Sequence, residues 1–192
     1  MYYIVRHGQT EGNKLKTLQG RSNRPLNELG MEQAKTLGEY FAGEGIRFDR
    51  VYSSPLERAQ QTARLAAGDD AEIIVDDRII EIDYGPYEGA SLMEPPEEIK
   101  TFFADFVNNP QPEGLEPLDS IVARMGEFLE EISGCQGNVL ISTHAIAMKG
   151  GLEYLDTEAN GAFWSRYIAN CSVYAFDWAD GEYKVPQEIE YR

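Results

Sequence analysis

The chain of 192 residues carries 17 Lys plus Arg against 33 Asp plus Glu, a formal net charge of −16. A chain this acidic repels a phosphate backbone, which argues against nucleic acid as a partner. With 42% apolar and 26% charged residues, the composition is typical of a globular protein and not of a disordered or fibrous one, and the length predicts one domain over residues 1–192.

The two cysteines, Cys135 and Cys171, form neither a CxxC motif nor the dense spacing of a disulfide scaffold. This pattern favours a reducing, cytoplasmic setting. The apolar stretch Tyr2–Val5 follows no basic leader, and no apolar run approaches ~20 residues. We therefore expect a cytoplasmic protein with no export signal and no membrane partner.

Charge is unevenly distributed along the chain. Residues 1–30 contain five basic and two acidic side chains, a net charge of +3, which leaves −19 on the rest. Convergent arginines in this segment can hold a small anion even where the wider surface repels a large one. Chance clustering on a solvated loop predicts the same charge count and stays open as an alternative.

The first predicted elements are a buried strand, a helix and a second strand. Tyr2–Val5 reads as the strand, and Arg6-His7-Gly8 follows where it ends. Asn27 is a good N-cap for a helix that continues to Gly43, and Arg50–Tyr52 is the next short strand. In an α/β sheet, ligands bind at the carboxyl ends of such strands.

A second helix is predicted from Ser54-Pro55-Leu56-Glu57 to Gly68. Serine at the N-cap, proline at the first helical position and glutamate three residues after the cap together indicate a capping box. Arg58 then lies in the first turn, near unpaired backbone N–H groups and the positive end of the helix dipole. That position suits an anion.

The middle of the chain combines short elements with an irregular insertion. Ile73–Val75 predicts a strand and Asp76–Gly89 an irregular segment, while apolar residues at helical spacing predict helices over Ile99–Val107 and Leu118–Ile132. The intervening region is rich in Pro and Glu. We interpret residues 90–117 as a cap inserted over the edge of the sheet.

The last third predicts a strand at Val139–Ile141 that leads into Ser142-Thr143-His144, a helix over Ala145–Leu155, and a hairpin that pairs Ser172–Trp178 with Glu182–Val185. Alternating strands and helices indicate an α/β fold. We expect a three-layer sandwich with a mainly parallel central sheet, flanked by helices and carrying a small inserted cap.

His7 and His144 are the only two histidines, and each follows a short apolar strand. Both imidazoles are therefore expected at one edge of the sheet, beside Arg6, in an arrangement suited to chemistry on an anion. A two-histidine metal site is the alternative. It needs a third ligand, and Arg6 opposes a cation, so we predict no metal.

Several motifs resemble those of the histidine phosphatase superfamily, also called the phosphoglycerate mutase-like family. In chain order they are Arg6-His7-Gly8-Gln9-Thr10 with Asn13, Gln19-Gly20-Arg21, Pro25-Leu26-Asn27-Glu28-Leu29-Gly30, Ser53-Ser54-Pro55-Leu56-x-Arg58-Ala59-x-Gln61-Thr62-Ala63, Arg78-x-x-Glu81-Ile82-x-Tyr84-Gly85-x-Tyr87-Glu88-Gly89, Ser142-Thr143-His144 and Asn170-Cys171-Ser172. Their order and number are far more specific than any one motif.

The resemblance implies a phosphohistidine intermediate on His7, and an imidazole with a pKa near ~6.5 is largely neutral and nucleophilic at pH 7. The resemblance implies that Glu81 is the general acid and base. Without the motif, Glu81 would be interpreted as a solvated loop residue. We expect Lys16, Arg21 and Lys149 to be solvated surface residues. The implied catalytic set is His7, Glu81, Arg6, Arg58 and His144. The implied phosphate-binding set is Arg6, Thr10, Asn13, Gln19, Gly20, Arg58 and Ala145, with no cofactor.

Three positions depart from the family pattern. Ala145 stands where glycine is usual, Asn23 where aspartate is common, and Gly114-Leu115-Glu116-Pro117 where Gly-Glu-Ser is typical. Ala145 keeps its backbone N–H but adds a methyl group near the phosphate. This bears on efficiency and substrate size and not on the class of reaction.

The family contains both phosphatases and mutases, and mutases have longer insertions that protect the phosphoenzyme from water. The short chain and cap therefore favour a phosphatase that acts on a small phosphorylated metabolite. A phosphoglycerate mutase-type phosphotransferase and a catalytically weak, phospholigand-binding regulatory member remain alternatives. Phe102, Phe103 and Phe106 either select the leaving group or pack on the sheet, and the sequence does not rank substrates.

Overall fold

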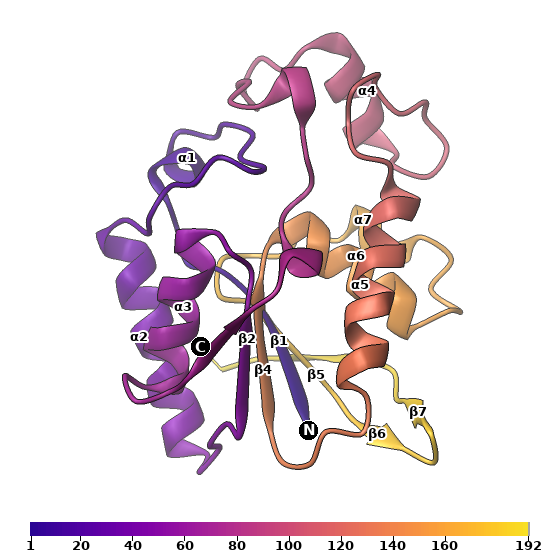
Figure 1. The fold of residues 1–192 in the computed structure, drawn as a ribbon. Helices are drawn as coiled ribbons and strands as arrows, with labels where there is room; N and C mark the ends of the chain where they lie inside the picture. Colours follow the sequence, from indigo (N-terminus) through magenta and orange to yellow (C-terminus); the bar gives the residue numbers. More distant parts are fainter. Residues whose placement is uncertain (192) are drawn as a thin grey trace.

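A computed structural model describes residues 1–191 and shows one mixed sheet between two layers of helices (Figure 1). The strand order is β3-β2-β4-β1-β5-β8, in which the first four strands are parallel to one another, β5 pairs antiparallel with β1, and β8 pairs antiparallel with β5. The strands are β1 (Tyr2–Arg6), β2 (Arg50–Ser53), β3 (Ile73–Val75), β4 (Val139–Thr143), β5 (Val173–Phe176) and β8 (Gln187–Ile189). The predicted α/β sandwich with a mainly parallel sheet is confirmed.

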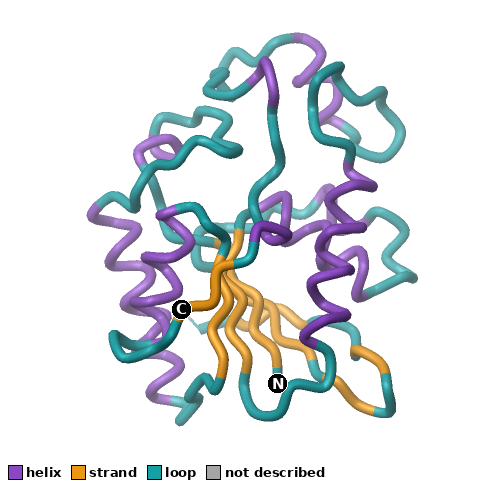
Figure 2. Tube along the Cα trace, viewed as in Figure 1, coloured by secondary structure: helices purple, strands orange, loops and turns teal. Residues whose placement is uncertain are grey.

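The two faces of the sheet are covered by different helices, as Figure 2 shows. On one face lie α2 (Glu28–Gly43) and α3 (Glu57–Ala67), and on the other α5 (Leu118–Ile132) and α6 (Ala145–Leu155) (Figure 1). The shorter elements are α1 (Glu11–Lys14), α4 (Glu97–Ala104), α7 (Ala162–Ser165), the 3₁₀ turns η1 (Asp77–Ile79) and η2 (Gly85–Tyr87), and the hairpin of β6 (Trp178–Ala179) and β7 (Glu182–Tyr183). No helix within residues 1–191 is long and apolar enough to cross a membrane.

The apolar runs in β1 and β4 form strands because both of their faces are buried. Ile4 and Ile141 belong to the core cluster that includes α5 and α6, while Val5 and Leu140 belong to the cluster that includes α2 and α3. These buried central strands fix the positions at which the loops after their carboxyl ends begin.

The predicted capping box at the start of α3 is wrong. The helix begins at Glu57 and its N-cap residue is Leu56, which has no side-chain cap, while the Ser54 hydroxyl contacts the Nε2 atom of His144 at 2.7 Å. The Oδ1 atom of Asn23 accepts instead from the Glu57 N–H at 2.7 Å. Asn23, one of the departures from the family pattern, therefore caps α3 from a distant loop.

The helix predicted over Ile99–Val107 ends early, since α4 ends at Ala104. The Oδ1 atom of Asp105 accepts from the backbone N–H groups of Val107 and Asn108 at 3.0 and 3.1 Å. Such a local side-chain bond competes with helical hydrogen bonds and terminates the helix. Phe106 is thus presented from a turn and not from a helix face.

The predicted C-terminal hairpin is also wrong in its extent. β5 pairs with β1 and β8, and the turn at Asp180-Gly181 joins only β6 and β7. Asp180 and Gly181 both have positive φ, 59° and 81°, which is typical of a tight hairpin turn. The added antiparallel strands extend the sheet beyond β1.

Residues 90–117 rise beyond the carboxyl edge of the sheet, at the top of Figure 1, with α4 at the far end. Ile99 and Phe102 of α4 are buried in the same core cluster as α5, and the Leu18 N–H donates to the Ala90 carbonyl at 2.8 Å. The segment and the loop after β1 are therefore held together above the strand ends. Its status as a separate cap insertion stays a prediction.

Candidate active site

The two histidines meet at the carboxyl edge of the sheet. β1 and β4 are aligned with Arg6 opposite Thr143, and the His7 N–H donates to the Thr143 carbonyl at 3.0 Å. The ring centroids of His7 and His144 are 5.1 Å apart, and both rings are buried. The register of two parallel strands thus places both imidazoles in one small volume.

The hydrogen bonds of His7 determine its tautomer. Nδ1 lies 2.7 Å from the Gly8 carbonyl, which can only accept, so Nδ1 carries the hydrogen. The Nε–H of Arg58 donates to Nε2 at 3.2 Å, so Nε2 presents a lone pair. Burial and the charges of Arg58 and Arg6 hold the pKa of His7 well below 6.5. His7 is therefore neutral at pH 7 and nucleophilic through Nε2.

Gly8 allows the loop after β1 to pack tightly against the start of α2. A Cβ atom on Gly8 would lie 2.4 Å from the Gly30 carbonyl oxygen, which belongs to the backbone and cannot move aside. The glycine that follows His7 is therefore required by close packing. This contact fixes the carbonyl that holds Nδ1 of His7.

Arg58 is fully buried and is held by two carbonyls, because its Nη1 donates to Ser22 and its Nη2 to Gly20, both at 2.7 Å. With its amide oriented so that each atom has a partner, Gln19 donates to Thr10 Oγ1 at 2.7 Å and accepts from Nε and Nη1 of Arg58 at 3.1 Å. Burial lowers the pKa of Arg58 to about 10, so its guanidinium remains charged at pH 7.

Two buried side-chain nitrogens within residues 1–191 have no hydrogen-bond partner, Nε of Arg6 and Nδ1 of His144. The Ser54 hydroxyl accepts from the Leu56 N–H at 3.3 Å and can donate its hydrogen to Nε2 of His144, which leaves a hydrogen on Nδ1. An unsatisfied buried donor costs about 1–3 kcal/mol, so such groups are rare without a function. Two beside His7 indicate a binding site for an anion.

Glu81 is buried at the N-terminus of α6, where three backbone N–H groups hold its carboxylate. Oε1 accepts from Ile82 at 3.0 Å and from Ala147 at 2.9 Å, and Oε2 accepts from Ile146 at 3.3 Å. Ala145 begins this helix with no positive φ, so its methyl group adds no backbone strain. The Glu81 carboxyl group is thus held in one place and lines the same cavity as His7.

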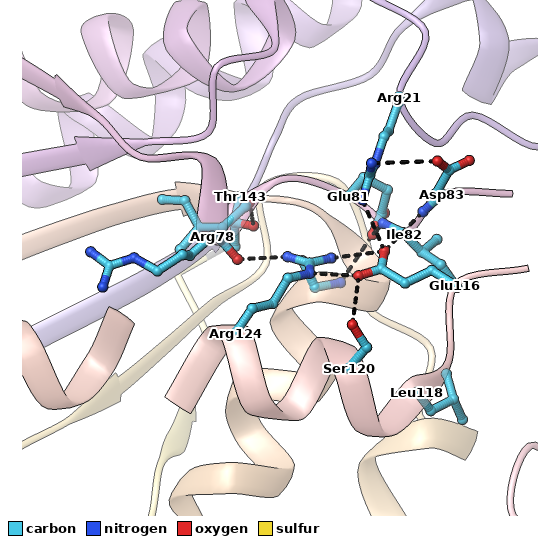
Figure 3. A network of polar contacts seen from close by, with 12 residues as sticks. Arg21, Arg78, Glu81, Ile82, Asp83, Glu116, Leu118, Ser120, Arg124 and Thr143 are labelled. Carbon is cyan, nitrogen blue, oxygen red and sulfur yellow. Dashed lines mark hydrogen bonds and ion pairs between the residues drawn. The ribbon is translucent and has the colours of Figure 1, made fainter. Parts of the chain in front are cut away.

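A polar network shown in Figure 3 positions the loop that carries Glu81. Glu116 accepts from the Asp83 N–H at 3.0 Å and from Nε of Arg124 at 2.8 Å, while Nη1 of Arg124 donates to the Arg78 carbonyl at 2.6 Å. The loop is thereby pinned on both sides of Glu81. Neither Glu116 nor Arg124 was predicted from the sequence to be functional, and the available signal was an arginine between the buried positions of α5.

A cavity of about 780 Å³ opens beside His7. Six of the predicted site residues line it: Arg6, His7, Asn13, Gln19, Glu81 and Ala145. The other four, Thr10, Gly20, Arg58 and His144, do not line the cavity. Each of these four contacts a lining residue or another of the four. Phe103 and Phe106 also line the cavity, while Phe102 belongs to the core cluster. Phe102 thus packs in the core, and selection of the leaving group by Phe103 and Phe106 stays a prediction.

The expectation of a solvated Lys149 is wrong. This residue of α6 lines the cavity with 8% of its surface exposed, and its Nζ donates to the Trp164 carbonyl at 2.6 Å. Burial lowers the pKa of its amine to about 8. The absence of any other charged residue from Ala145 to Leu152 was the signal for burial. Lys16 is exposed, and Arg21 pairs with Asp83 and Glu116 at 3.4 Å.

No group of three or more His, Cys, Asp or Glu side chains in the described part of the chain is placed to hold a metal ion. The charged groups nearest to His7 are guanidinium groups of Arg6 and Arg58. These groups attract an anion and repel a cation. The arrangement can therefore stabilise the charge on phosphoryl oxygens.

Comparison with known proteins gives a consistent result. The family model for branch 1 of the histidine phosphatase superfamily matches residues 2–188. Phosphoserine phosphatase 1 of Hydrogenobacter thermophilus is 34% identical over 88% of this chain and 82% of its own. Fructose-2,6-bisphosphatase TIGAR of Xenopus tropicalis is 39% identical over 66% of this chain and 47% of its own. The structure of Bacillus stearothermophilus YhfR matches with a TM-score of 0.83 and 27% identity, covering 96% and 94% of the two chains.

Proposed function

The chain belongs to the histidine phosphatase superfamily and is a phosphomonoester hydrolase, and we propose that it hydrolyses a small phosphorylated metabolite through a phosphohistidine intermediate on His7. The observation that carries this proposal is the tautomer of His7, whose Nε2 lone pair lies beside Arg58 and near two unpaired donors on Arg6 and His144. A neutral nucleophile among fixed cationic donors suits attack on a phosphate ester.

In the first step, Nε2 of His7 attacks phosphorus and the bond from phosphorus to the ester oxygen breaks. Glu81, as a carboxylic acid, transfers its proton to the departing oxygen, so the product leaves as an alcohol. Arg6, Arg58 and the Nδ1 hydrogen of His144 stabilise the charge on the three phosphoryl oxygens. Glu81 lines the same cavity as His7, which supports this role.

In the second step, water attacks phosphorus of phospho-His7 and the bond from phosphorus to Nε2 breaks. Glu81, now a carboxylate, accepts the proton of the attacking water, so phosphate leaves and both residues return to their starting states. The three backbone N–H groups around Glu81 hold the carboxylate in one place for both proton transfers. Asn13 and Gln19 line the cavity as further phosphate-binding groups.

Treatment with a metal chelator is expected to leave the activity unchanged. The guanidinium groups of Arg6 and Arg58, together with the Nδ1 hydrogen of His144, take the part that Mg²⁺ or Zn²⁺ has in metal-dependent phosphatases. The measurement is phosphate release from a panel of phosphomonoesters with and without EDTA, with a metal-dependent phosphatase as the control for chelation. Activity that disappears with EDTA and returns with one metal ion would contradict the proposed mechanism.

A further inference from the structure

Lys149 introduces a second positive charge into the cavity. It follows Ala145 by four residues on α6, which places both on one face of the helix, and both line the cavity that contains His7. The proposed two-step mechanism assigns Lys149 no part in phosphoryl transfer. Its position raises the question of which group it binds.

The direct contacts of the Lys149 ammonium are a backbone carbonyl and an aromatic ring, and neither carries a negative charge. Its ammonium donates one hydrogen to the Trp164 carbonyl and lies 5.1 Å from the centroid of the Phe106 ring. Within residues 1–191 it forms no ion pair. A lysine ammonium has three donors, and lysine is almost never fully buried without a counterion. A partner anion is therefore expected from the ligand.

We propose that Lys149 binds a carboxylate on the leaving group, so that the substrates are phosphomonoesters of hydroxycarboxylic acids. This inference rests on the proposed function, because it assumes that the phosphate binds at Arg6 and His7. The cavity of about 780 Å³ has room for a leaving group as well as the phosphate. Binding of the phosphate at Arg6 and His7 and of the carboxylate at Lys149 would fix the orientation of the substrate in the cavity.

The chemistry of the wall favours a carboxylate over a second phosphate. A phosphate dianion is commonly held by several donors or by guanidinium forks, whereas one ammonium matches the single charge of a carboxylate. The aromatic rings of Phe106 and Trp164 lower the local dielectric, which strengthens an ion pair formed against them. Lys149 thus provides one strong, desolvated contact for a monoanion.

A different role for Lys149 would have a different kinetic signature. Glu81 and Arg6 both act on the charge of Lys149, since Glu81 raises and Arg6 lowers the pKa of its amine. If Lys149 served only to support Glu81 electrostatically, its removal would slow all substrates by the same factor. Recognition of the leaving group predicts a loss confined to substrates that carry the carboxylate.

The test compares 3-phosphoglycerate with sn-glycerol 3-phosphate, two alkyl phosphates that differ by a carboxylate in place of a hydroxymethyl group. Values of kcat/KM are measured by phosphate release for the wild type, Lys149→Met and Lys149→Arg. Lys35→Met, an exposed residue of α2 outside this cavity, is the control for loss of one positive charge. Near-UV circular dichroism and Tm verify that each variant is folded.

The wild type is expected to prefer 3-phosphoglycerate. Lys149→Met should lose about 10- to 100-fold in kcat/KM for 3-phosphoglycerate and about threefold or less for sn-glycerol 3-phosphate. Lys149→Arg should retain part of the preference, and Lys35→Met should retain all of it. Truncation of an unpaired buried cation to methionine is expected to preserve the fold.

The possible failures are distinguishable. Equal losses for both esters in Lys149→Met, or a wild type without preference for the carboxylate, would overturn the role of Lys149 and leave the phosphatase mechanism intact. Hydrolysis of other phosphomonoesters but of neither member of the pair would overturn the inference in the same way. Absence of activity on every phosphomonoester would contradict the proposed function itself.

Discussion

Replacing His7 by alanine is expected to lower kcat/KM by about 10³-fold or more for every phosphomonoester. The substitution removes the Nε2 lone pair that attacks phosphorus, and the other imidazole, His144, does not line the cavity that contains His7. The measurement is the steady-state rate of phosphate release, with the wild type at the same active-site concentration.

Binding of inorganic phosphate to His7→Ala separates loss of the nucleophile from collapse of the site. Arg58 keeps its bonds to the Gly20 and Ser22 carbonyls, so the phosphate-binding groups remain in place. The Kd for phosphate is therefore expected to stay within about tenfold of the wild type. Undiminished turnover in this variant would show that His7 is not the nucleophile.

Replacing Glu81 by glutamine is expected to affect substrates according to their leaving groups. A general acid matters most where the departing oxygen is basic, so an alkyl phosphate depends on it and 4-nitrophenyl phosphate hardly does. The loss in kcat/KM should be on the order of 10² or more for an alkyl phosphate and several-fold at most for 4-nitrophenyl phosphate. The variant keeps the shape of the side chain and removes its proton.

Asp83→Asn is the matched control, since Asp83 lies on the same loop but pairs with Arg21 and does not line the cavity. It should lower kcat/KM equally and modestly for both leaving groups. The comparison uses kcat/KM because slow attack of water on phospho-His7 would reduce kcat alike for both substrates. Equal losses in kcat/KM for Glu81→Gln would show that Glu81 does not donate a proton in the first step.

The positions of His7 and His144 could be inferred from the sequence because short, wholly apolar runs identify buried parallel strands. Once β1 and β4 are neighbours, their carboxyl ends coincide and the residues after them must lie side by side. The position of Glu81 could not be inferred in this way, because no helical or strand periodicity in its irregular segment indicates where its side chain points. Only the motif pointed to it before the structure placed it against the N-terminus of α6.

The features that the sequence did not predict depend on partners from distant parts of the chain. Ser54 fits the local pattern of an N-cap, but His144 engages its hydroxyl and Asn23 caps α3 instead. The burial of Lys149 could not be predicted from helical periodicity. Periodicity indicates on which face of the helix a residue lies, but not whether that face lines a cavity. Glu116 acts through Arg124 and a backbone N–H, which local patterns do not reveal.

The central claim is a covalent phosphoenzyme on His7, and the most direct test is to trap it. Glu81→Gln mixed with 4-nitrophenyl phosphate should accumulate the intermediate, because its formation needs little acid catalysis while its hydrolysis loses the general base. The reaction is quenched in denaturant without acid, and the phosphorylated residue is located by mass spectrometry of peptides. We predict phosphate on His7 in a stoichiometric burst; phosphate on serine, or nitrophenol release without any phosphorylated His7, would contradict the mechanism.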